Sequence, residues 1–462
     1  MRSYSAFFTF LFGLVTFLNT QGMAASRKPW AYSVRYEAKS GDLHITAQLP
    51  EGRLILNNDG AVYVSAVQAL DGKAREGTNS WTLPHCSQAL CTITYIFHLR
   101  NAAKNAGKRD DIIAFADAIM SIPSLWLLRP SALPDSQPVT FRFEASDGAH
   151  VTTGLFPSPH NPKTFVSTAD HLMDLPYTLF GAYHAKSWTV QGAAIELAII
   201  PAAYGVTDVA IEAWSKRAVD ALIRYYGVFP VPHAMIVVVS RAFYDGPGKS
   251  FGDGGGVTVN PLSPKAGEAE LERDWVMTHE IVHLALPSVP YQHHWLEEGL
   301  ATYIEPIARV RSGELTAESV FADMMDGMPK GQPQSGDKGL DGPSSWGRTY
   351  WGGALFSLLA DKEFRERSHG KVGLEHALRG ILANGGSMAV NWDIDRVFAT
   401  GDKAAGYPVL SELYARMKDQ AVTINLDELW KNLGVVRALD GKVYFDDKAP
   451  LASVRRAIIT GL

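Results

Sequence analysis

The amino-acid sequence predicts an α+β protein in which a β-rich beginning is followed by a mixed middle part and a mainly helical end. Three observations support this class. Apolar and polar residues alternate in short runs over residues 26–165, which is the period of a half-buried strand. Residues 166–365 combine such runs with amphipathic helical spacing, and residues 366–462 show mainly helical spacing. Residues 1–25 have a different character and are excluded from the fold.

The first residues have the pattern of an export signal. Arg2 precedes the apolar run 7–18, and small residues follow at 22–25, where we expect cleavage after Ala24 or Ala25. This run is shorter than the roughly 20 residues that a membrane-spanning helix needs, and no other stretch is long enough. The sequence therefore predicts a protein without a stable membrane span that is exported to a periplasmic or extracellular compartment.

The composition is that of a sizeable globular protein. The 462 residues are 46% hydrophobic and carry a formal net charge of -5, so the chain can bury two or three cores. No cluster of basic residues is interleaved with aromatic ones, which argues against nucleic-acid binding. Nothing in the sequence indicates the oligomeric state.

Within the β-rich part, the clearest strand candidates are 32–36, 43–47, 92–97 and 139–143. The Pro-dense stretch 156–162 is interpreted as a linker at the end of this part.

The chain has two cysteines, Cys86 and Cys91, just before the expected strand 92–97. In an oxidising compartment such a close pair is typical of a disulfide that closes a short loop. Metal binding by the two thiols is the alternative; His85 offers a third ligand, but a fourth is missing nearby.

Three elements are expected in the middle part before residue 241. Residues 193–200 and 234–240 are interpreted as strands, and Asp208–Tyr226 as an amphipathic helix that Asp208 caps and Gly227 ends. In the last part, the clearest helices are 409–417 and 427–433.

The most informative motif is the pair of histidines at 279 and 283. Residues four apart lie on one face of a helix, so His279 and His283 can reach one metal ion while Glu280 flanks it. This is the HExxH arrangement. On its own the pattern also occurs as a solvated pair on an ordinary helix.

A second segment supplies a third ligand. Two prolines separate the first helix from a second one, 298–305, which we expect to end before Pro306. A turn between them would bring Glu298 beside the histidines. Glu305 lies on the same face of the second helix and is a candidate to orient a metal-bound imidazole. Glu297 points about 100° away from Glu298, so only one of the two can face the metal.

At these residues the sequence resembles the gluzincin zinc metallopeptidases of clan MA, and especially the M1 aminopeptidase and M61 glycyl aminopeptidase families. Those families carry HExxH, then a Glu in E-G-[FL]-A, then a Tyr in Y-x-K-G-A; the matches here are His279–His283, Glu298–Ala301 and, with Gly352 in place of the Lys, Tyr350–Ala354. The resemblance implies a thermolysin-like catalytic domain over 166–365, with Zn²⁺ held by His279, His283 and Glu298. It also implies Glu280 as general base and Tyr350 as a hydrogen-bond donor to the oxyanion.

The chain departs from the M1 pattern at the substrate-binding strand. M1 enzymes have a Gly-x-Met-Glu-Asn segment whose Glu captures a free amine, and the nearest candidate here, 254–260, contains no carboxylate. We expect Gly255, Gly256, Val257 and Thr258 to pair with substrate as an added strand. Gly248–Gly252 is interpreted as a loop beside the cleft.

Two histidines adjoin the ligand helix. His293 and His294 either touch the substrate or are exposed loop residues, and the second interpretation is favoured.

The sequence thus predicts a hydrolase, namely an aminopeptidase-like zinc metallopeptidase acting on peptide or protein substrates. The missing amine-binding carboxylate leaves an endopeptidase of the same fold open. A non-catalytic binding protein stabilised by zinc is a third hypothesis, although a structural site would need neither Glu280 nor Tyr350.

Overall fold

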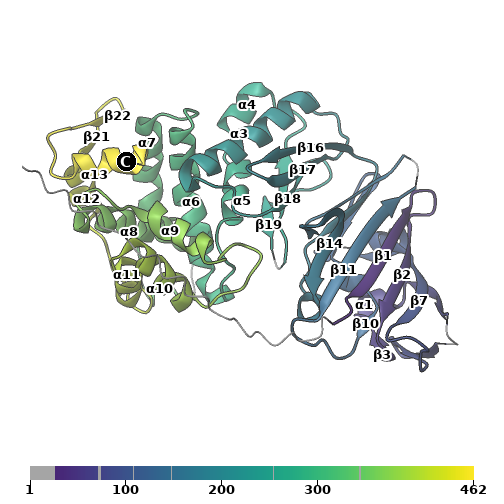
Figure 1. The fold of residues 1–462 in the computed structure, drawn as a ribbon. Coiled ribbons are helices and arrows are strands. Elements are labelled where there is room, and N and C mark those ends of the chain that lie inside the picture. Colours follow the sequence, from purple (N-terminus) through teal and green to yellow (C-terminus); the bar gives the residue numbers. More distant parts are fainter. Residues whose placement is uncertain are drawn as a thin grey trace, which may run out of the picture.

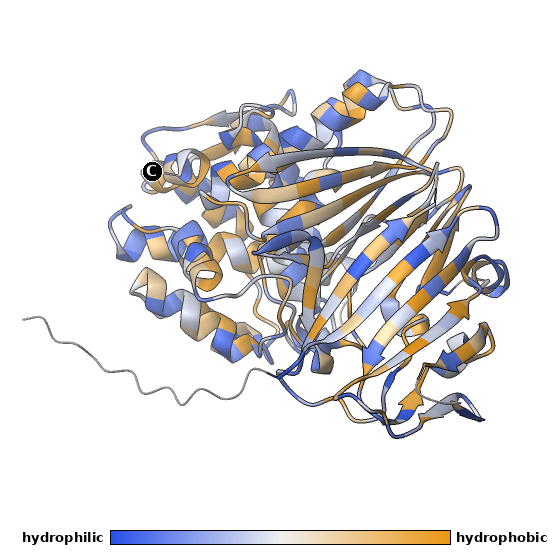
Figure 2. Cartoon of the chain, turned by 45° about the vertical axis from the view of Figure 1, so that its right-hand side comes forward, coloured by the Kyte–Doolittle hydropathy of each residue, from blue (hydrophilic) through white to orange (hydrophobic). Residues whose placement is uncertain are grey.

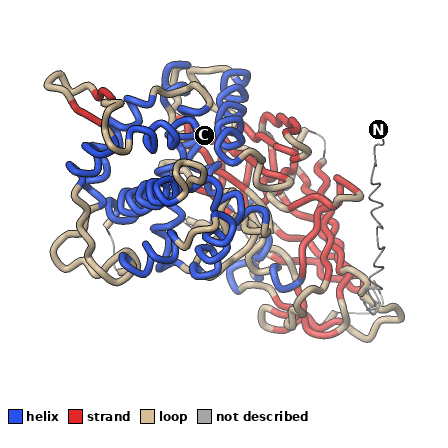
Figure 3. The backbone as a smooth tube through the Cα atoms, turned by 60° about the vertical axis from the view of Figure 1, so that its left-hand side comes forward, coloured by secondary structure: helices blue, strands red, loops and turns tan. Residues whose placement is uncertain are grey.

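The computed structural model describes residues 27–70, 74–107, 109–146, 148–252, 254–342 and 345–461. The expected export signal, residues 1–25, lies outside the described residues. Most strands gather at one end of the molecule and most helices at the opposite end (Figure 3). This arrangement confirms the α+β class. Over the described residues, no helix is both long and apolar enough to cross a membrane.

A seven-stranded sheet dominates the first part of the chain (Figure 1). Its order is β13-β14-β11-β1-β2-β7-β4. The strands are β1 (Trp30–Glu37), β2 (Asp42–Leu49), β4 (Val64–Ala69), β7 (Cys91–Phe97), β11 (Pro138–Ala145), β13 (Phe156–Ser158) and β14 (Asn161–Thr168). Hydrophobic and hydrophilic residues alternate along several of these strands (Figure 2), as expected for a sheet with one face on a core.

Two four-stranded sheets complete this part, in the orders β10-β3-β6-β5 and β12-β15-β9-β8. Their strands are β3 (Gly52–Ile55), β5 (Arg75–Gly77), β6 (Ser80–Leu83), β8 (Ile112–Phe115), β9 (Ala118–Ser121), β10 (Arg129–Pro130), β12 (His150–Thr153) and β15 (Thr178–Gly181). The short helices are α1 (Asn58–Ala61), η1 (Pro123–Leu125), α2 (Leu99–Asn105) and η2 (Ala169–His171). A disulfide joins Cys86 to Cys91, whose Cα atoms are 5.5 Å apart.

The Pro-dense stretch 156–162 is not a linker. It forms the hairpin of β13 and β14, in which β13 is the outermost strand of the seven-stranded sheet. Proline is tolerated there because an edge strand leaves some backbone N–H groups without a partner strand. The β-rich part consequently extends beyond residue 165, as far as β15.

The middle part is built on a five-stranded sheet with the order β16-β17-β18-β20-β19. The strands are β16 (His184–Val190), β17 (Ala193–Ile199), β18 (His233–Ser240), β19 (Lys249–Phe251) and β20 (Val257–Leu262). The three inner strands are parallel, whereas β16 and β19 are antiparallel edge strands. Every residue of β18 is buried, which explains the continuous apolar run 234–239 within it.

Helix α3 (Asp208–Tyr226) connects β17 to β18 and has the predicted bounds. Its cap is Thr207 rather than Asp208: the Thr207 side chain accepts a hydrogen bond from the backbone N–H of Ala210. Gly227 ends the helix with φ 78°, a left-handed conformation that favours glycine.

Helices make up most of the remaining chain. They are α4 (Glu268–Arg273), α5 (Val276–His283), η3 (Tyr291–His293), α6 (His294–Arg311), α7 (Ala317–Gly327), η4 (Met328–Gly331), η5 (Arg348–Gly352), α8 (Gly353–Arg367), α9 (Leu374–Ala383), α10 (Ile394–Ala405), α11 (Val409–Met417), α12 (Leu426–Leu433) and α13 (Ala452–Thr460), with the hairpin β21 (Val435–Arg437) and β22 (Val443–Phe445).

The prediction that the helix containing Glu298 ends before Pro306 is wrong. Pro306 lies inside helix α6. Proline costs the helix one backbone hydrogen bond. The neighbouring side chains of Tyr303, Ile304 and Ile307 are fully buried. Their packing stabilises the helix on both sides of the proline.

Both faces of the five-stranded sheet are covered. On one face β17 and β18 contribute to a large core with helices α3, α5, α6 and α8. On the other face a smaller cluster includes Met120, Leu179 and Val237, where the sheet β12-β15-β9-β8 packs. The β-rich part has a third core of its own. The five-stranded sheet is therefore a rigid base for the helices that follow it.

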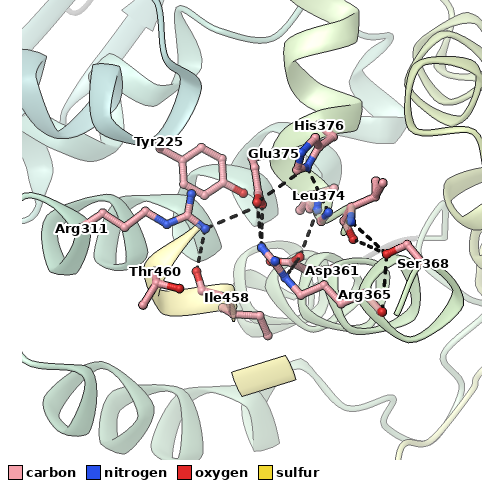
Figure 4. Close-up of polar contacts among 12 residues, drawn as sticks. Tyr225, Arg311, Asp361, Arg365, Ser368, Leu374, Glu375, His376, Ile458 and Thr460 are labelled. Carbon is pink, nitrogen blue, oxygen red and sulfur yellow. Dashed lines mark hydrogen bonds and ion pairs between the residues drawn. The ribbon is translucent and has the colours of Figure 1, made fainter. Parts of the chain in front are cut away.

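A buried ionic network joins four helices in the last part (Figure 4). Arg365 of α8 donates hydrogen bonds to Asp361, one turn earlier, and to Glu375 of α9. Arg311 at the end of α6 lies 3.7 Å from Glu375 and donates to the Ile458 carbonyl of α13. The network connects the C-terminal helix α13 to α6, which carries Glu298, and through Glu375 to α8 and α9.

Candidate metal centre

Helix α5 presents His279 and His283 on one face, with their ring centroids 5.0 Å apart. Met277 and Ile281, two residues to either side of His279, are fully buried in the large core. This packing fixes the rotation of the helix about its axis. His279 itself is 3% exposed.

Helix α6 brings Glu298 to the histidines. Its Oε2 lies 3.1 Å from Nε2 of His279 and 3.8 Å from Nε2 of His283. One ligand atom from each of the three residues lies within 4.8 Å of the other two, and no other such group of His, Cys, Asp and Glu occurs in the described ranges. Two imidazoles and one carboxylate form the donor set of a catalytic zinc ion, with one coordination position left over.

The glycine after Glu298 has a steric role. A Cβ atom at Gly299 would lie 2.3 Å from the backbone of Gly353, at the start of α8. Helices α6 and α8 thus approach so closely that only glycine fits at either position. This contact places the segment preceding α8, including Tyr350, beside Glu298.

The protonation states of the three ligands differ. Burial lowers the pKa of His283 to about 4, so this imidazole is neutral. Burial would raise the pKa of Glu298, but hydrogen bonds from His279 and His294 hold it well below its usual range. Burial would lower the pKa of His279, yet the hydrogen bond with Glu298 outweighs it and raises the pKa. A proton and a cation compete for the His279 imidazole, and the raised pKa extends this competition to higher pH.

Glu280 lines the same cavity as the three ligands. Burial raises the pKa of its carboxyl group to about 7, and a hydrogen bond from the Ser250 hydroxyl opposes this rise. A carboxyl group with a pKa near neutrality can both accept and return a proton.

Tyr350 lies in a π-helical turn, Arg348–Gly352, directly before α8. Such turns often occur at functional sites. Its ring stacks on His279 with 6.2 Å between centroids. Burial and the carboxylate of Glu298 raise the pKa of Tyr350, so its hydroxyl keeps its proton and can donate it in a hydrogen bond.

Glu305 does not hydrogen-bond to either imidazole within the described part of the chain, contrary to our expectation. Its carboxylate accepts a hydrogen bond from Arg309 at 2.8 Å, one turn further along α6. Burial raises the pKa of Glu305 to about 7. Its influence on His279 is electrostatic.

His293 and His294 are not both exposed loop residues. His293 is 5% exposed and hydrogen-bonds to Asp341. His294 begins α6 and lines the cavity, with Nε2 3.2 Å from Oε1 of Glu298 and Nδ1 3.0 Å from Glu297. The two oxygens of Glu298 are thereby divided: one faces the imidazoles of α5, and the other faces His294.

The ligands open into a cavity of about 600 Å³. One wall is the edge strand β19, which contributes Lys249, Ser250 and Phe251, with Gly248 and Gly252 at its ends. The predicted substrate strand, Gly255, Gly256, Val257 and Thr258, is elsewhere. Val257 and Thr258 belong to β20, which pairs with β18 on one side and β19 on the other and has no free edge.

The sequence analysis did not predict the contacts of two residues at this site, Ser250 with Glu280 and His294 with Glu298. Ser250 lies in a Gly-rich segment too short to show strand alternation, although it was expected beside the cleft. His294 had one available signal, since it stands four residues before Glu298 and shares its helical face.

Comparison with known proteins adds evidence at the level of the fold. Neither a protein-family model nor a curated protein sequence matches this chain. Solved structures do match. An aminopeptidase N family protein from Idiomarina loihiensis superposes with a TM-score of 0.63 and 16% identity, covering 88% of this chain and 78% of that protein.

A second similar structure is a mutant of an M1 zinc metallopeptidase from Deinococcus radiodurans. Its TM-score is 0.51 at 14% identity, and the match covers 86% of this chain and 95% of that one. The chain therefore has the α+β fold of the M1 aminopeptidases, as its motifs predicted.

Proposed function

We propose that this protein is a zinc-dependent peptidase. The observation that carries the proposal is the convergence of His279, His283 and Glu298, with ligand atoms within 4.8 Å of one another, beside Glu280 in a cavity large enough for a peptide segment. The similar structures are peptidase-family proteins, which supports hydrolysis as the type of reaction.

Each residue of the site has a role in this proposal. Zinc, when bound, supplies a Lewis acid that acidifies water and polarises a carbonyl group. Glu280 accepts the proton of the attacking water and returns it to the leaving amine. The Tyr350 hydroxyl donates a hydrogen bond to the carbonyl oxygen as negative charge develops there.

The test is a comparison of wild type with Glu280→Gln, with zinc content measured on the same preparations. We expect the variant to bind zinc normally and to lose hydrolysis of unstructured peptides by at least about a hundredfold, the usual range of general base catalysis. Full activity of Glu280→Gln would contradict the proposal.

An endopeptidase is the second candidate, and one observation favours it over an aminopeptidase. Every described carboxylate that lines the cavity is already engaged: Glu280 with Ser250, Glu298 with His279 and His294, and Glu297 with His294 and the Val289 N–H. None is left to bind a free amine. Matched peptides with free and acetylated N-termini decide between the two, because an aminopeptidase cleaves only the form with a free N-terminus.

We also propose that the protein is exported. The pattern of residues 1–25 supports this, and the Cys86–Cys91 disulfide fits an oxidising compartment. Identification of the mature N-terminus in expressing cells tests it, with a start at residue 25 or 26 as the expected result.

A further inference from the structure

Three exposed aromatic side chains lie at the metal-binding cavity or against residues that line it. Trp275, just before α5, is 53% exposed; Tyr291, in η3, is 89% exposed; and Trp346, just before η5, is 62% exposed. They come from three separate segments of the chain. We name these three residues the aromatic rim.

Each ring of the aromatic rim lies against a residue that lines the cavity. The centroid of Trp275 is 5.3 Å from that of His279, and the centroid of Trp346 is 5.3 Å from that of Tyr350. Tyr291 stacks on His294 at 5.8 Å. The three rings thus lie beside the metal-binding residues, His294 and Tyr350.

A role in supporting the neighbouring side chains does not explain why the rings of the aromatic rim are exposed. A ring that only braced an imidazole would be covered on its other face, because exposed aromatic area is unfavourable in water. Here half or more of each side chain remains accessible. Apolar area gathered around a polar site is typical of a ligand-binding surface.

Part of the cavity wall is apolar. Phe251, Val276, Leu286 and Met388 are among the residues that line it. Because the described carboxylates of the cavity are engaged with other groups, a basic side chain of a substrate would find no free acidic partner among the described residues of the wall. An apolar side chain, in contrast, would be covered on the inside by these residues and on the outside by the rim.

We propose that the aromatic rim selects peptide segments with bulky apolar side chains next to the cleaved bond. This inference rests on the proposed peptidase function and names its substrate class. Peptides with phenylalanine or leucine flanking the bond are preferred over those with alanine.

Binding to the zinc-loaded Glu280→Gln variant tests the inference separately from catalysis. The probes are two synthetic peptides that differ only in having phenylalanine or alanine on both sides of the same bond, and affinity is measured by calorimetry. We expect the phenylalanine peptide to bind on the order of tenfold to a hundredfold more tightly, as burial of a large apolar side chain implies.

Changes in the rim should remove this preference. Adding Trp275→Ala or Trp346→Ala to Glu280→Gln should lower the affinity ratio several-fold, whereas the conservative Trp275→Phe or Trp346→Phe should retain most of it. Tyr444→Ala is the matched control, since Tyr444 is 51% exposed but lies on β22 and is not part of the cavity. It should leave the ratio unchanged.

The outcomes separate the two proposals. Equal affinity for the two peptides, or a ratio that survives both alanine variants, overturns the inference whether or not wild type is active. A strong preference that depends on the rim supports selection of apolar segments by the rim, whereas failure of the zinc-loaded wild type to cleave either peptide counts separately against the peptidase function.

Discussion

At the residue scale, the two carboxylate oxygens of Glu298 have different neighbours. Oε2 lies near both imidazoles of α5, and Oε1 lies 3.2 Å from His294. A ligand carboxylate held through its second oxygen keeps one orientation, which lowers the cost of gathering the ligands around an ion.

We therefore predict that His294→Ala weakens zinc binding by about tenfold to a hundredfold, the usual effect of losing a residue that orients a ligand. Competition with a chelator of known affinity measures it. His171→Ala is the matched control: its side chain is 39% exposed, against 40% for His294, and it also lies near an acidic residue, Asp170. Equal affinity of both variants and wild type would refute this role of His294.

Zinc affinity should also depend on pH. Glu298 raises the pKa of His279 above its ordinary value, so this imidazole is protonated below that pKa and cannot bind a metal. His283 stays neutral because burial lowers its pKa to about 4. We predict that affinity falls by roughly tenfold per pH unit once the pH drops below the pKa of His279, as for one displaced proton. An affinity that is constant from about pH 8 to about pH 5 would contradict this.

At the element scale, the close approach of α6 and α8 sets the position of Glu298 and Tyr350. Gly299 and Gly353 face each other without room for a Cβ atom. The prediction is that Gly299→Ala pushes the helices apart, lowers the free energy of unfolding by about 1–3 kcal/mol and weakens zinc binding. Gly267→Ala serves as control, because Gly267 has open space around its Cα and φ -99°.

Urea unfolding and zinc titration of both variants provide the measurements. The prediction fails if Gly299→Ala is as stable as Gly267→Ala and binds zinc as tightly.

Local patterns in the sequence predicted some elements well and others poorly. Helix α3 was predicted with its full bounds because Gly227 provides an explicit end signal, and α11 because its apolar spacing is regular. Pro306 was misjudged because buried packing on both sides outweighs one missing hydrogen bond. The edge strand β19 was missed because three residues are too few to show a period.

The residues of the site also differ in how well the sequence predicted them. His279 and His283 follow from their spacing of four residues on one helix, whereas Glu298 was chosen over Glu297 because of the family resemblance. Tyr350, far along the chain, was found only through family resemblance. Ser250 depends on a sheet edge that no local pattern reveals.

On the scale of the whole molecule, the ionic network around Arg365 connects the metal-binding helices to the C-terminus. Arg365, Asp361 and Glu375 are all at most 1% exposed. Breaking such a network leaves a buried charge without a partner, which costs far more than the same change at the surface.

Glu375→Ala should therefore lower the free energy of unfolding by about 3–5 kcal/mol. Glu366→Ala removes a partly exposed partner of Lys362 on the same helix α8 and should cost at most about 1 kcal/mol. Urea unfolding measures the free energy of unfolding of both variants. Equal decreases would show that the buried network contributes no more to stability than the exposed ion pair.

The central claim is that one zinc ion binds between α5 and α6, and X-ray diffraction of zinc-loaded crystals at the zinc absorption edge tests it most directly. The predicted result is a single anomalous peak about 2.0–2.2 Å from His279, His283 and Glu298, with water in the remaining position. A peak elsewhere, or a fourth protein ligand in place of water, would contradict the claim.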